Sequence, residues 1–180
     1  MIGSPPRFRY AGFLLFAALA ALLLVYKPDL LRPGTRATAT PPLTNVSAID
    51  GDSLRNGTEE VRIMGIDAPE LNQTCRDERG RGWACGREAR KQLSALIARG
   101  DVRCTPNGRD RYGRTLARCS ARTVADIGDS MVRAGYAVDF MNGGYQSAEK
   151  EARGARRGIW NGEFERPADY RKLHPRTAQR

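Results

Sequence analysis

Histidine is almost absent from the sequence, and cysteine is arranged unlike a metal site. The one histidine, His174, lies in a polar C-terminal segment at residues 163–180, so we expect no histidine to take part in catalysis. The 4 cysteines lack the close paired spacing of a zinc site. No internal repeat is present, and 180 residues, 41% of them hydrophobic, are too few for two ordinary domains. The sequence therefore predicts one folded unit with an appendage.

Negative charge is the scarcer sign. The 30 lysines and arginines exceed the 20 aspartates and glutamates, which gives a formal net charge of +10. Such an excess favours a polyanionic partner or an anionic membrane surface. Because basic surfaces also occur on proteins that bind no nucleic acid, the motifs have to decide between these partners.

An uncharged, apolar run at residues 11–26 follows a basic flank at residues 1–10. As a helix this run would be about 24 Å long, a little short of the hydrocarbon core of a bilayer, which is ~30 Å thick. Both an uncleaved transmembrane anchor and a cleaved signal segment fit this length, and we favour the anchor. Residues 27–44 are rich in proline and threonine and are predicted to be a linker.

The cysteines occur in an even number and are predicted to form disulfides. Cys104 and Cys119 flank a turn almost symmetrically, so two antiparallel strands leaving that turn would place them opposite each other. Cys75 and Cys85 would close a loop rich in arginine and glycine. Disulfides persist in oxidising compartments, which indicates a domain outside the cytoplasm. Reduced, buried thiols in a cytosolic protein are the alternative.

Turn signals and hydrophobic periodicity predict short strands and three helices. Strands are expected at 46–49 and 61–66 and around the second cysteine pair, and helices at 86–98, 126–134 and 146–157. This order suits an α+β fold: a five-stranded OB-type Greek-key β-barrel with three helices, preceded by the N-terminal transmembrane or signal helix. The domain is placed at residues 45–162, and the tail at 163–180 is expected to be ordered only in part.

Three short stretches combine acidic and basic residues in a pattern typical of phosphodiester cleavage: residues 50–53, 62–70 and 110–114. In the first, Gly51 is expected to take a backbone conformation that other residues avoid. In the second, Pro69 fixes the backbone. A regular strand would point Arg62 and Asp67 to opposite faces, and a bend at Gly65 would bring them to the same side.

The residue types in these stretches have distinct expected roles. Asp52 and Asp67 offer oxygen ligands to a hard divalent cation. Glu70 is the expected base for the attacking water. Arg62 and Arg114 are expected to bind phosphate oxygens as bidentate forks. An ion pair with a neighbouring arginine is the alternative for Glu70, and an ordinary charge beside a hairpin is the alternative for Arg114.

The ordered set of motifs resembles the staphylococcal nuclease (thermonuclease) family. The resemblance runs from about Val46 to Trp160 and includes residues 86–89, 131–137 and 158–160. It implies the OB-type barrel and the release of 3′-phosphate products from DNA or RNA. It also implies that Ca²⁺ is bound by Asp52, Asp67 and the backbone carbonyl of Ala68, with Asp50 close by, and that Arg62, Glu70 and Arg114 are catalytic.

Further contacts with nucleic acid are expected from Arg87, Lys91, Arg111 and Tyr112. A solvated basic face is the alternative for the arginine-rich loop and helix start, and Tyr112 is interpreted as turn packing and not as a catalytic acid. The family places nucleotide-packing tyrosines after the second helix, where this chain offers Phe140 or Tyr145.

The sequence thus predicts a calcium-dependent nuclease that acts on DNA, RNA or both. It would be held in a bacterial inner membrane through residues 11–26 with its domain facing the periplasm or exterior, or be secreted if the signal is cleaved. The alternatives are a non-catalytic nucleic-acid or polyanion-binding module tethered to the membrane, and a membrane-tethered structural domain. No protein partner is inferred.

Overall fold

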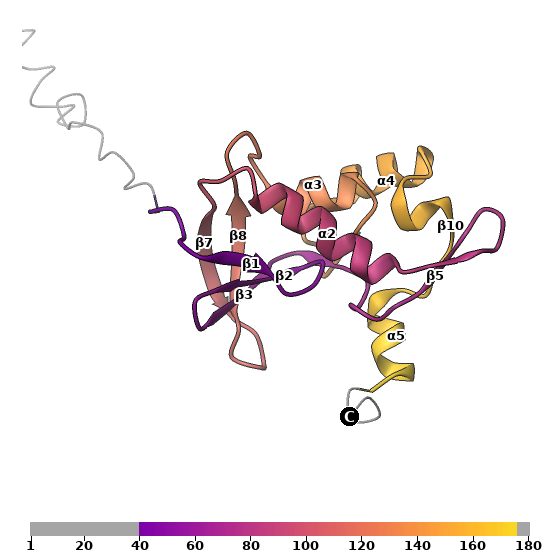
Figure 1. Ribbon diagram of the computed structural model, residues 1–180, viewed down its shortest axis with the longest axis horizontal. Coiled ribbons are helices and arrows are strands. Elements are labelled where there is room, and N and C mark those ends of the chain that lie inside the picture. Colours follow the sequence, from indigo (N-terminus) through magenta and orange to yellow (C-terminus); the bar gives the residue numbers. More distant parts are fainter. Residues whose placement is uncertain (1–39, 176–180) are drawn as a thin grey trace, which may run out of the picture. The chain divides into compact units, whose positions relative to one another are not determined.

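The computed structural model describes residues 40–175 (Figure 1). The predicted basic flank, the membrane or signal segment at 11–26 and nearly all of the linker lie outside the described residues. Within residues 40–175, no helix combines the length and apolar character that crossing a bilayer would take.

The fold is α+β and is built around a five-stranded sheet with the order β1-β2-β3-β8-β7. All neighbours are antiparallel except β3 and β8, which run parallel. The strands are β1 (Val46–Ala48), β2 (Ser53–Asn56), β3 (Glu59–Ile63), β7 (Arg103–Arg109) and β8 (Thr115–Ser120).

The expected closed barrel is a wrong prediction for the described part of the chain. Among residues 40–175, no strand pairing joins the edge strands β1 and β7. The chain just before β1 meets the chain just before β7 through one backbone hydrogen bond, from Leu43 N–H to Val102 O at 2.7 Å. Because a single bond replaces a ladder there, the sheet stays open.

Two smaller sheets complete the strand content. The first pairs β4 (Ile66–Asp67) with β9 (Val138–Asp139), and the second joins β5 (Cys75–Asp77), β6 (Gly82–Trp83) and β10 (Gly162–Glu163). The expected strand at 61–66 is divided by a turn, because Gly65 adopts φ +83°. The segment 75–85, expected to be a loop, is a hairpin.

Four α-helices lie within the described residues: α2 (Cys85–Ile97), α3 (Ile127–Arg133), α4 (Gln146–Gly154) and α5 (Pro167–Leu173). A 3₁₀ turn, η2 (Gly158–Asn161), follows α4. The first three match the predicted helices within a few residues. The fourth corrects the expectation of three helices and of a largely irregular tail, and its proline occupies the first turn, where a missing N–H is tolerated.

Helices α2 and α3 cover one side of the main sheet, with α4 beyond them, whereas α5 lies apart from this layer (Figure 1). The core between them contains Leu54 and Ile63 from the sheet, Leu93 from α2, and Ile127 and Met131 from α3, all at most 1% exposed. This layer fixes the position of the segment between β1 and α2, which carries most of the predicted site.

Two disulfides join Cys75 to Cys85 and Cys104 to Cys119, the pairing expected from the sequence. Cys104 and Cys119 are directly opposite each other in the β7–β8 ladder. Cys75 and Cys85 connect the β5–β6 hairpin to the first residue of α2 and lie in a second apolar cluster.

Candidate active site

Arg62 is the centre of the predicted site. It lies on β3, and its Nη1 donates to Asp52 Oδ1 at 2.7 Å while its Nη2 donates to Asp67 Oδ1 at 2.9 Å. Both carboxylates are almost fully buried, with Asp52 3% and Asp67 1% exposed. The structure therefore brings together three of the residues that the sequence assigned to the site.

The turn at Gly65 makes this arrangement possible. Arg62 and Asp67 are five positions apart, so a continuous strand would point them to opposite faces. Gly65 adopts φ +83°, and a Cβ there would come within 2.8 Å of the Gly143 Cα. The left-handed turn and the close approach of two backbones both favour glycine. The predicted bend is therefore confirmed.

Asp52 is held by the chain on three sides. Besides the bond from Arg62, its Oδ2 accepts from the Ala68 N–H at 2.9 Å, and its Oδ1 accepts from the Ser53 hydroxyl at 3.1 Å. Burial, together with the nearby Asp50 and Asp67 carboxylates, raises the pKa of Asp52 to about 7. The positive charge of Arg62 and the hydrogen bond from Ala68 act in the opposite direction but do not cancel this rise. The site is thus short of positive charge.

Gly51 has a different role from the one expected. Its φ is not in the left-handed region. A Cβ at this position would lie 2.6 Å from the Ala68 Cβ and 2.8 Å from the Ala89 Cβ of α2. The glycine therefore allows the turn that carries Asp50 and Asp52 to pack tightly between the second acidic segment and α2. Asp50 also stabilises that turn, because its Oδ1 accepts from the Asp52 N–H at 3.0 Å.

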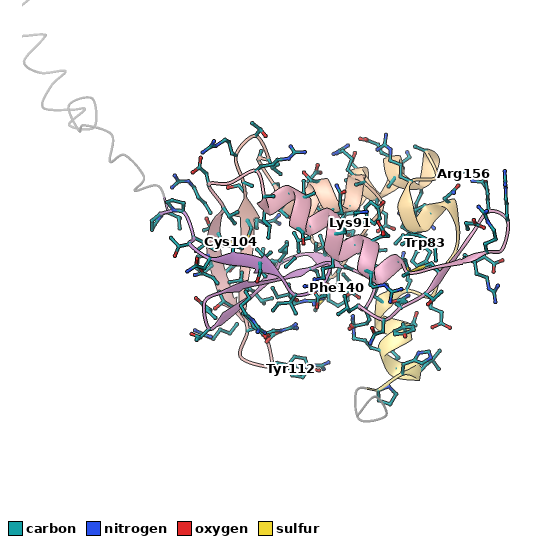
Figure 2. All side chains as sticks on the ribbon, in the orientation of Figure 1. Trp83, Lys91, Cys104, Tyr112, Phe140 and Arg156 are labelled. Carbon is teal, nitrogen blue, oxygen red and sulfur yellow. A yellow bond between two sulfur atoms is a disulfide. The ribbon has the colours of Figure 1, made fainter. Side chains whose placement is uncertain are left out.

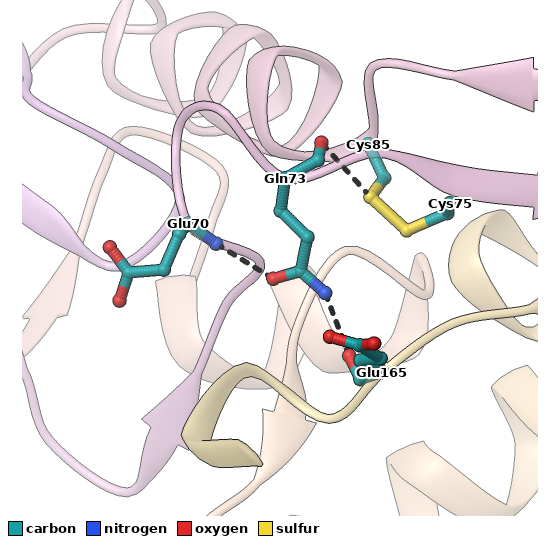
Figure 3. The surroundings of a disulfide bond; sticks show 5 residues. All are labelled: Glu70, Gln73, Cys75, Cys85 and Glu165. Atoms are coloured by element: carbon teal, nitrogen blue, oxygen red, sulfur yellow. Dashed lines mark hydrogen bonds between the residues drawn. A yellow bond between two sulfur atoms is a disulfide. The ribbon is translucent and has the colours of Figure 1, made fainter. Parts of the chain in front are cut away.

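Gln73 fixes the loop that carries Glu70. Its side chain is 1% exposed. As Figure 3 shows, its Oε1 accepts from the Glu70 N–H at 3.1 Å, and its Nε2 donates to the Glu165 carbonyl, just before α5, at 2.7 Å. Its own carbonyl accepts from the Gly86 N–H at 3.3 Å. Gln73 thus connects three segments: its side-chain amide bonds to Glu70 and to the segment leading to α5, and its backbone carbonyl bonds to the start of α2.

Gly86 is needed for the same loop to pack on α2. A Cβ on Gly86 would lie 1.8 Å from the Glu70 carbonyl oxygen, which is a steric clash with backbone. The side chain of Glu70 points away from Gln73 (Figure 3) and is 24% exposed.

Arg171 enters the site from α5, which the sequence did not indicate. Its Nη1 donates to Asp67 Oδ1 at 2.9 Å and to Glu70 Oε1 at 3.0 Å, and its Nη2 donates to Asp67 Oδ2 at 3.0 Å. The ion pair considered for Glu70 therefore exists, but its arginine is distant in sequence. Burial alone lowers the pKa of Arg171, and the hydrogen bonds and charges of Asp67 and Glu70 outweigh it and raise the pKa.

The charges of the cluster do not balance. Four carboxylates surround two guanidinium groups, which leaves two negative charges when all are ionised; the members are Asp50, Asp52, Asp67, Glu70, Arg62 and Arg171. Among residues 40–175, no three acidic, histidine or cysteine side chains converge closely enough to form a metal centre. The donors are nevertheless carboxylate oxygens in a site with excess negative charge, which suits one hard divalent cation.

The β7–β8 hairpin carries Arg111, Tyr112 and Arg114. Arg114 pairs with Asp110 at 2.8 Å, and within residues 40–175 it forms no ion pair or hydrogen bond with Asp52 or Asp67. Tyr112 is 70% exposed and projects from the hairpin in Figure 2, which corrects its interpretation as a packing residue. The Arg111 and Arg114 guanidiniums lie 4.9 Å and 5.6 Å from its ring centroid.

The remaining predicted contacts are separate from the carboxylates. Arg87 and Lys91 are exposed on α2, and Lys91 lies 3.6 Å from Glu88. Tyr145 is 4% exposed, and its hydroxyl bonds to Asp126 at 3.0 Å, so the expectation that it replaces a nucleotide-packing tyrosine is wrong. Phe140 is half-buried and stays a prediction for that role.

Comparisons with known proteins agree with this geometry. A sequence profile described as "Staphylococcal nuclease homologue" matches residues 60–162. The succinoglycan biosynthesis protein ExoI of Rhizobium meliloti is 36% identical over 153 residues, covering 83% of this chain and 76% of that protein. A micrococcal nuclease of Shigella flexneri is 32% identical over 163 residues, covering 81% and 88%.

A fungal relative is longer than this chain. The probable endonuclease LCL3 of Pyricularia oryzae is 28% identical over 162 residues, which cover 82% of this chain and 61% of that protein. The profile match covers more than half of the chain, and two of these relatives are more than 30% identical over about four fifths of it, which together show its family. The chain belongs to the staphylococcal nuclease family of nuclease-type hydrolases.

Proposed function

We propose that the chain is a calcium-dependent phosphodiesterase that hydrolyses DNA, RNA or both to 3′-phosphate products. The observation that carries this proposal is the buried pair Asp52 and Asp67, held in place by Arg62 and adjoining Glu70. The micrococcal nuclease and the endonucleases among the relatives support a nucleic-acid substrate. The formal net charge of +10 supports a polyanionic one.

Arg62 is oriented before substrate arrives. Two of its nitrogens already bond to buried carboxylates, so its guanidinium plane is fixed with little entropy left to lose. In this position it binds a phosphate oxygen and stabilises the negative charge that develops as water attacks. Arg114 is proposed to assist from the β7–β8 hairpin, where it exchanges its bond to Asp110 for a phosphate oxygen.

Glu70 is proposed to take the proton of the attacking water. The new bond joins the water oxygen to phosphorus, and the bond between phosphorus and the 5′ oxygen breaks. The leaving 5′ oxygen takes up a proton, so the products are a 3′-phosphate and a 5′-hydroxyl. Pro69 and the bond from the Glu70 N–H to Gln73 hold the backbone from which this carboxylate acts.

The cation is proposed to bind at Asp52, Asp67 and the Ala68 carbonyl, with Asp50 adding negative charge. When bound, it polarises a phosphoryl oxygen and lowers the cost of forming hydroxide. The oxygen-rich donor set and the excess of carboxylates over guanidiniums support a hard divalent cation over a softer transition metal.

A non-catalytic binding module is the competing function. Binding of phosphate requires cationic side chains, and a partly exposed carboxylate beside buried acidic residues does not contribute to it. Glu70 therefore separates the two functions, and its replacement is the test. A binding module keeps its affinity without Glu70, whereas the nuclease loses turnover.

The test compares digestion of single-stranded DNA and of RNA by the full chain in mild detergent, with Ca²⁺ or with chelator. Glu70→Gln should reduce the rate by at least about 10²-fold, the usual contribution of a general base, with little loss of binding. Glu60→Gln is the matched control, because Glu60 pairs with Arg55 on an exposed hairpin. Equal rates in both variants, or binding without cleavage in the unmodified protein, would overturn the proposal.

We further propose that residues 11–26 hold the domain at a bacterial inner membrane, facing the periplasm or exterior, or direct its secretion. The two disulfides support an oxidising location. The test is fractionation of cells combined with alkylation of thiols in the intact cell. Recovery in the cytosol with four alkylated cysteines would contradict this location.

A further inference from the structure

The C-terminal helix α5 places Arg171 where a cation would have to bind. Asp67 has two oxygens, and both accept hydrogen bonds from this guanidinium, at 2.9 and 3.0 Å. One of them also accepts from Arg62. These three hydrogen bonds fill most of the roughly four acceptor sites of the carboxylate, and Arg171 places a positive charge where a divalent cation would approach Asp67.

Arg171 also engages the proposed base. The same Nη1 that bonds to Asp67 lies 3.0 Å from Glu70 Oε1. A guanidinium that bridges these two carboxylates supplies the positive charge that a cation would otherwise provide. It also holds Glu70 Oε1 in a charge-assisted hydrogen bond.

We propose that Arg171 closes the site in the resting protein, and that a divalent cation must displace it from Asp67 before catalysis can begin. This inference rests on the proposed calcium-dependent function. It assigns to α5 a role that the predicted catalytic residues do not include, namely control of cation entry.

The attachment of α5 suits such a movement. Its first turn is anchored, because Pro167 is buried and the preceding Glu165 carbonyl accepts from Gln73. Its last turn is attached through Arg171 itself, and is otherwise open, since Leu173 is 67% exposed and the Arg171 side chain is 34% exposed. The helix end can therefore move outward without disturbing the core.

Release of Arg171 leaves the remaining site intact. Arg62 keeps its bonds to Asp52 and Asp67, and the Gln73 bond still holds the Glu70 backbone. The cost of opening is the loss of a bidentate, charge-assisted pair, which a cation at the same oxygens replaces. Because the competitor is part of the chain, the measured affinity for cation is lowered in proportion to the open fraction.

The test measures Ca²⁺ binding to the full chain by titration calorimetry, without substrate. Arg171→Gln should bind Ca²⁺ at least about tenfold more tightly than the unmodified protein, as expected if the open form is a tenth or less of the population. Lys172→Gln is the matched control, because it removes the same charge from the next position of α5, where Lys172 pairs with Asp169 in solvent. It should change the affinity less than about twofold.

Arg171→Lys distinguishes the guanidinium fork from the charge alone. Lysine keeps the positive charge but cannot hold both oxygens of Asp67 in parallel. Its Ca²⁺ affinity should lie between those of the unmodified protein and Arg171→Gln. Thermal unfolding in chelator should show that all variants are folded.

A second measurement follows α5 itself. In the unmodified protein, Ca²⁺ should accelerate amide hydrogen exchange at the last turn of α5, because the bonds of Arg171 to Asp67 are lost. In Arg171→Gln this exchange should be fast with and without Ca²⁺. Exchange that Ca²⁺ leaves unchanged or slows in the unmodified protein would overturn the displacement of α5.

The two proposals fail in different ways. If the unmodified protein and Arg171→Gln cleave DNA with Ca²⁺ and bind the ion with equal affinity, the nuclease stands and the closing role of Arg171 is overturned. If neither protein binds Ca²⁺ or cleaves, both the calcium-dependent function and the competition are overturned. Tighter binding by Arg171→Gln alone, with Lys172→Gln unchanged, supports the closing role.

Discussion

Replacing Gln73 should disconnect the proposed base from the fold. Its side chain is 1% exposed and makes two hydrogen bonds, from the Glu70 N–H at 3.1 Å and to the Glu165 carbonyl at 2.7 Å. Gln73→Met keeps the length of the side chain and removes both polar groups. The Glu70 N–H and the Glu165 carbonyl, both in partly buried positions, then lose this partner.

The expected loss follows from those two groups. Because both bonds are only partly buried, each is worth about 0.5–1.5 kcal/mol, so the free energy of unfolding should fall by about 1–3 kcal/mol. The effect on catalysis should be larger than stability alone explains, because a shift of about 1 Å in a reacting group costs roughly 10²-fold in rate. Glu70 would be free to make such a shift once its backbone is released.

Urea unfolding and cleavage rate measure the two effects separately. Gln92→Met is the control, because Gln92 lies half-buried on α2 and its side chain makes no hydrogen bond within residues 40–175. It should change the free energy of unfolding by less than about 0.5 kcal/mol, as surface substitutions do. If Gln73→Met behaves like this control in both assays, the amide does not position Glu70 and the reasoning is wrong.

Two further predictions concern the same framework. The double variant Cys104→Ala/Cys119→Ala removes a disulfide that spans 15 residues, which should lower the free energy of unfolding by about 3 kcal/mol. Its unfolding in urea should also be less sensitive to reductant than that of the unmodified protein. An unchanged urea midpoint would contradict this prediction. Gly86→Ala introduces a Cβ that would lie 1.8 Å from the Glu70 carbonyl oxygen, so the loop must move. Its cleavage rate should fall while its Ca²⁺ affinity changes little, and an unaltered rate would show that the loop position is unimportant.

The parts of the fold that the sequence predicted are those governed by local rules. Gly65 indicated a bend, and the bend is what lets Arg62 reach Asp67. Helix α2 was recognisable because its apolar residues recur at helical spacing, and the ends of α3 and α4 were indicated by the glycines at 135 and 158. The symmetric placement of Cys104 and Cys119 about a turn gave their pairing in the β7–β8 ladder.

The residues that the sequence did not reveal act through contacts between distant segments. Pro167 followed by charged residues is a signal for the start of α5, but nothing in the sequence shows that this helix docks on an acidic residue 104 positions earlier. Gln73 carries no charge and belongs to no motif, so its buried amide is visible only once Glu70 and Glu165 have been brought together. Local patterns cannot supply this information, because tertiary packing creates it.

Gly51 was correctly singled out from the sequence, but the reason given for a glycine at this position was wrong. The sequence drew attention to it because glycine between two aspartates is typical of a turn. The structure gives another reason, which is the contact of this position with Ala68 and Ala89. Since the contact requires that α2 lie against the acidic turn, it could not be inferred before the helix was placed.

The charge distribution explains why the closing residue is an arginine. A chain with a formal net charge of +10 attracts polyanions, whereas in its site carboxylates outnumber guanidiniums, an excess that contributes to raising the pKa of Asp52 to about 7. The excess negative charge in the site repels phosphate until a cation is added, so the binding of substrate and the binding of cation must be coupled. Arg171 supplies part of this charge in the absence of cation, and stabilises Asp67 and Glu70 against their mutual repulsion. Its removal should therefore tighten cation binding while it destabilises the cation-free protein, and these opposite signs distinguish a closing residue from one that merely supports the fold.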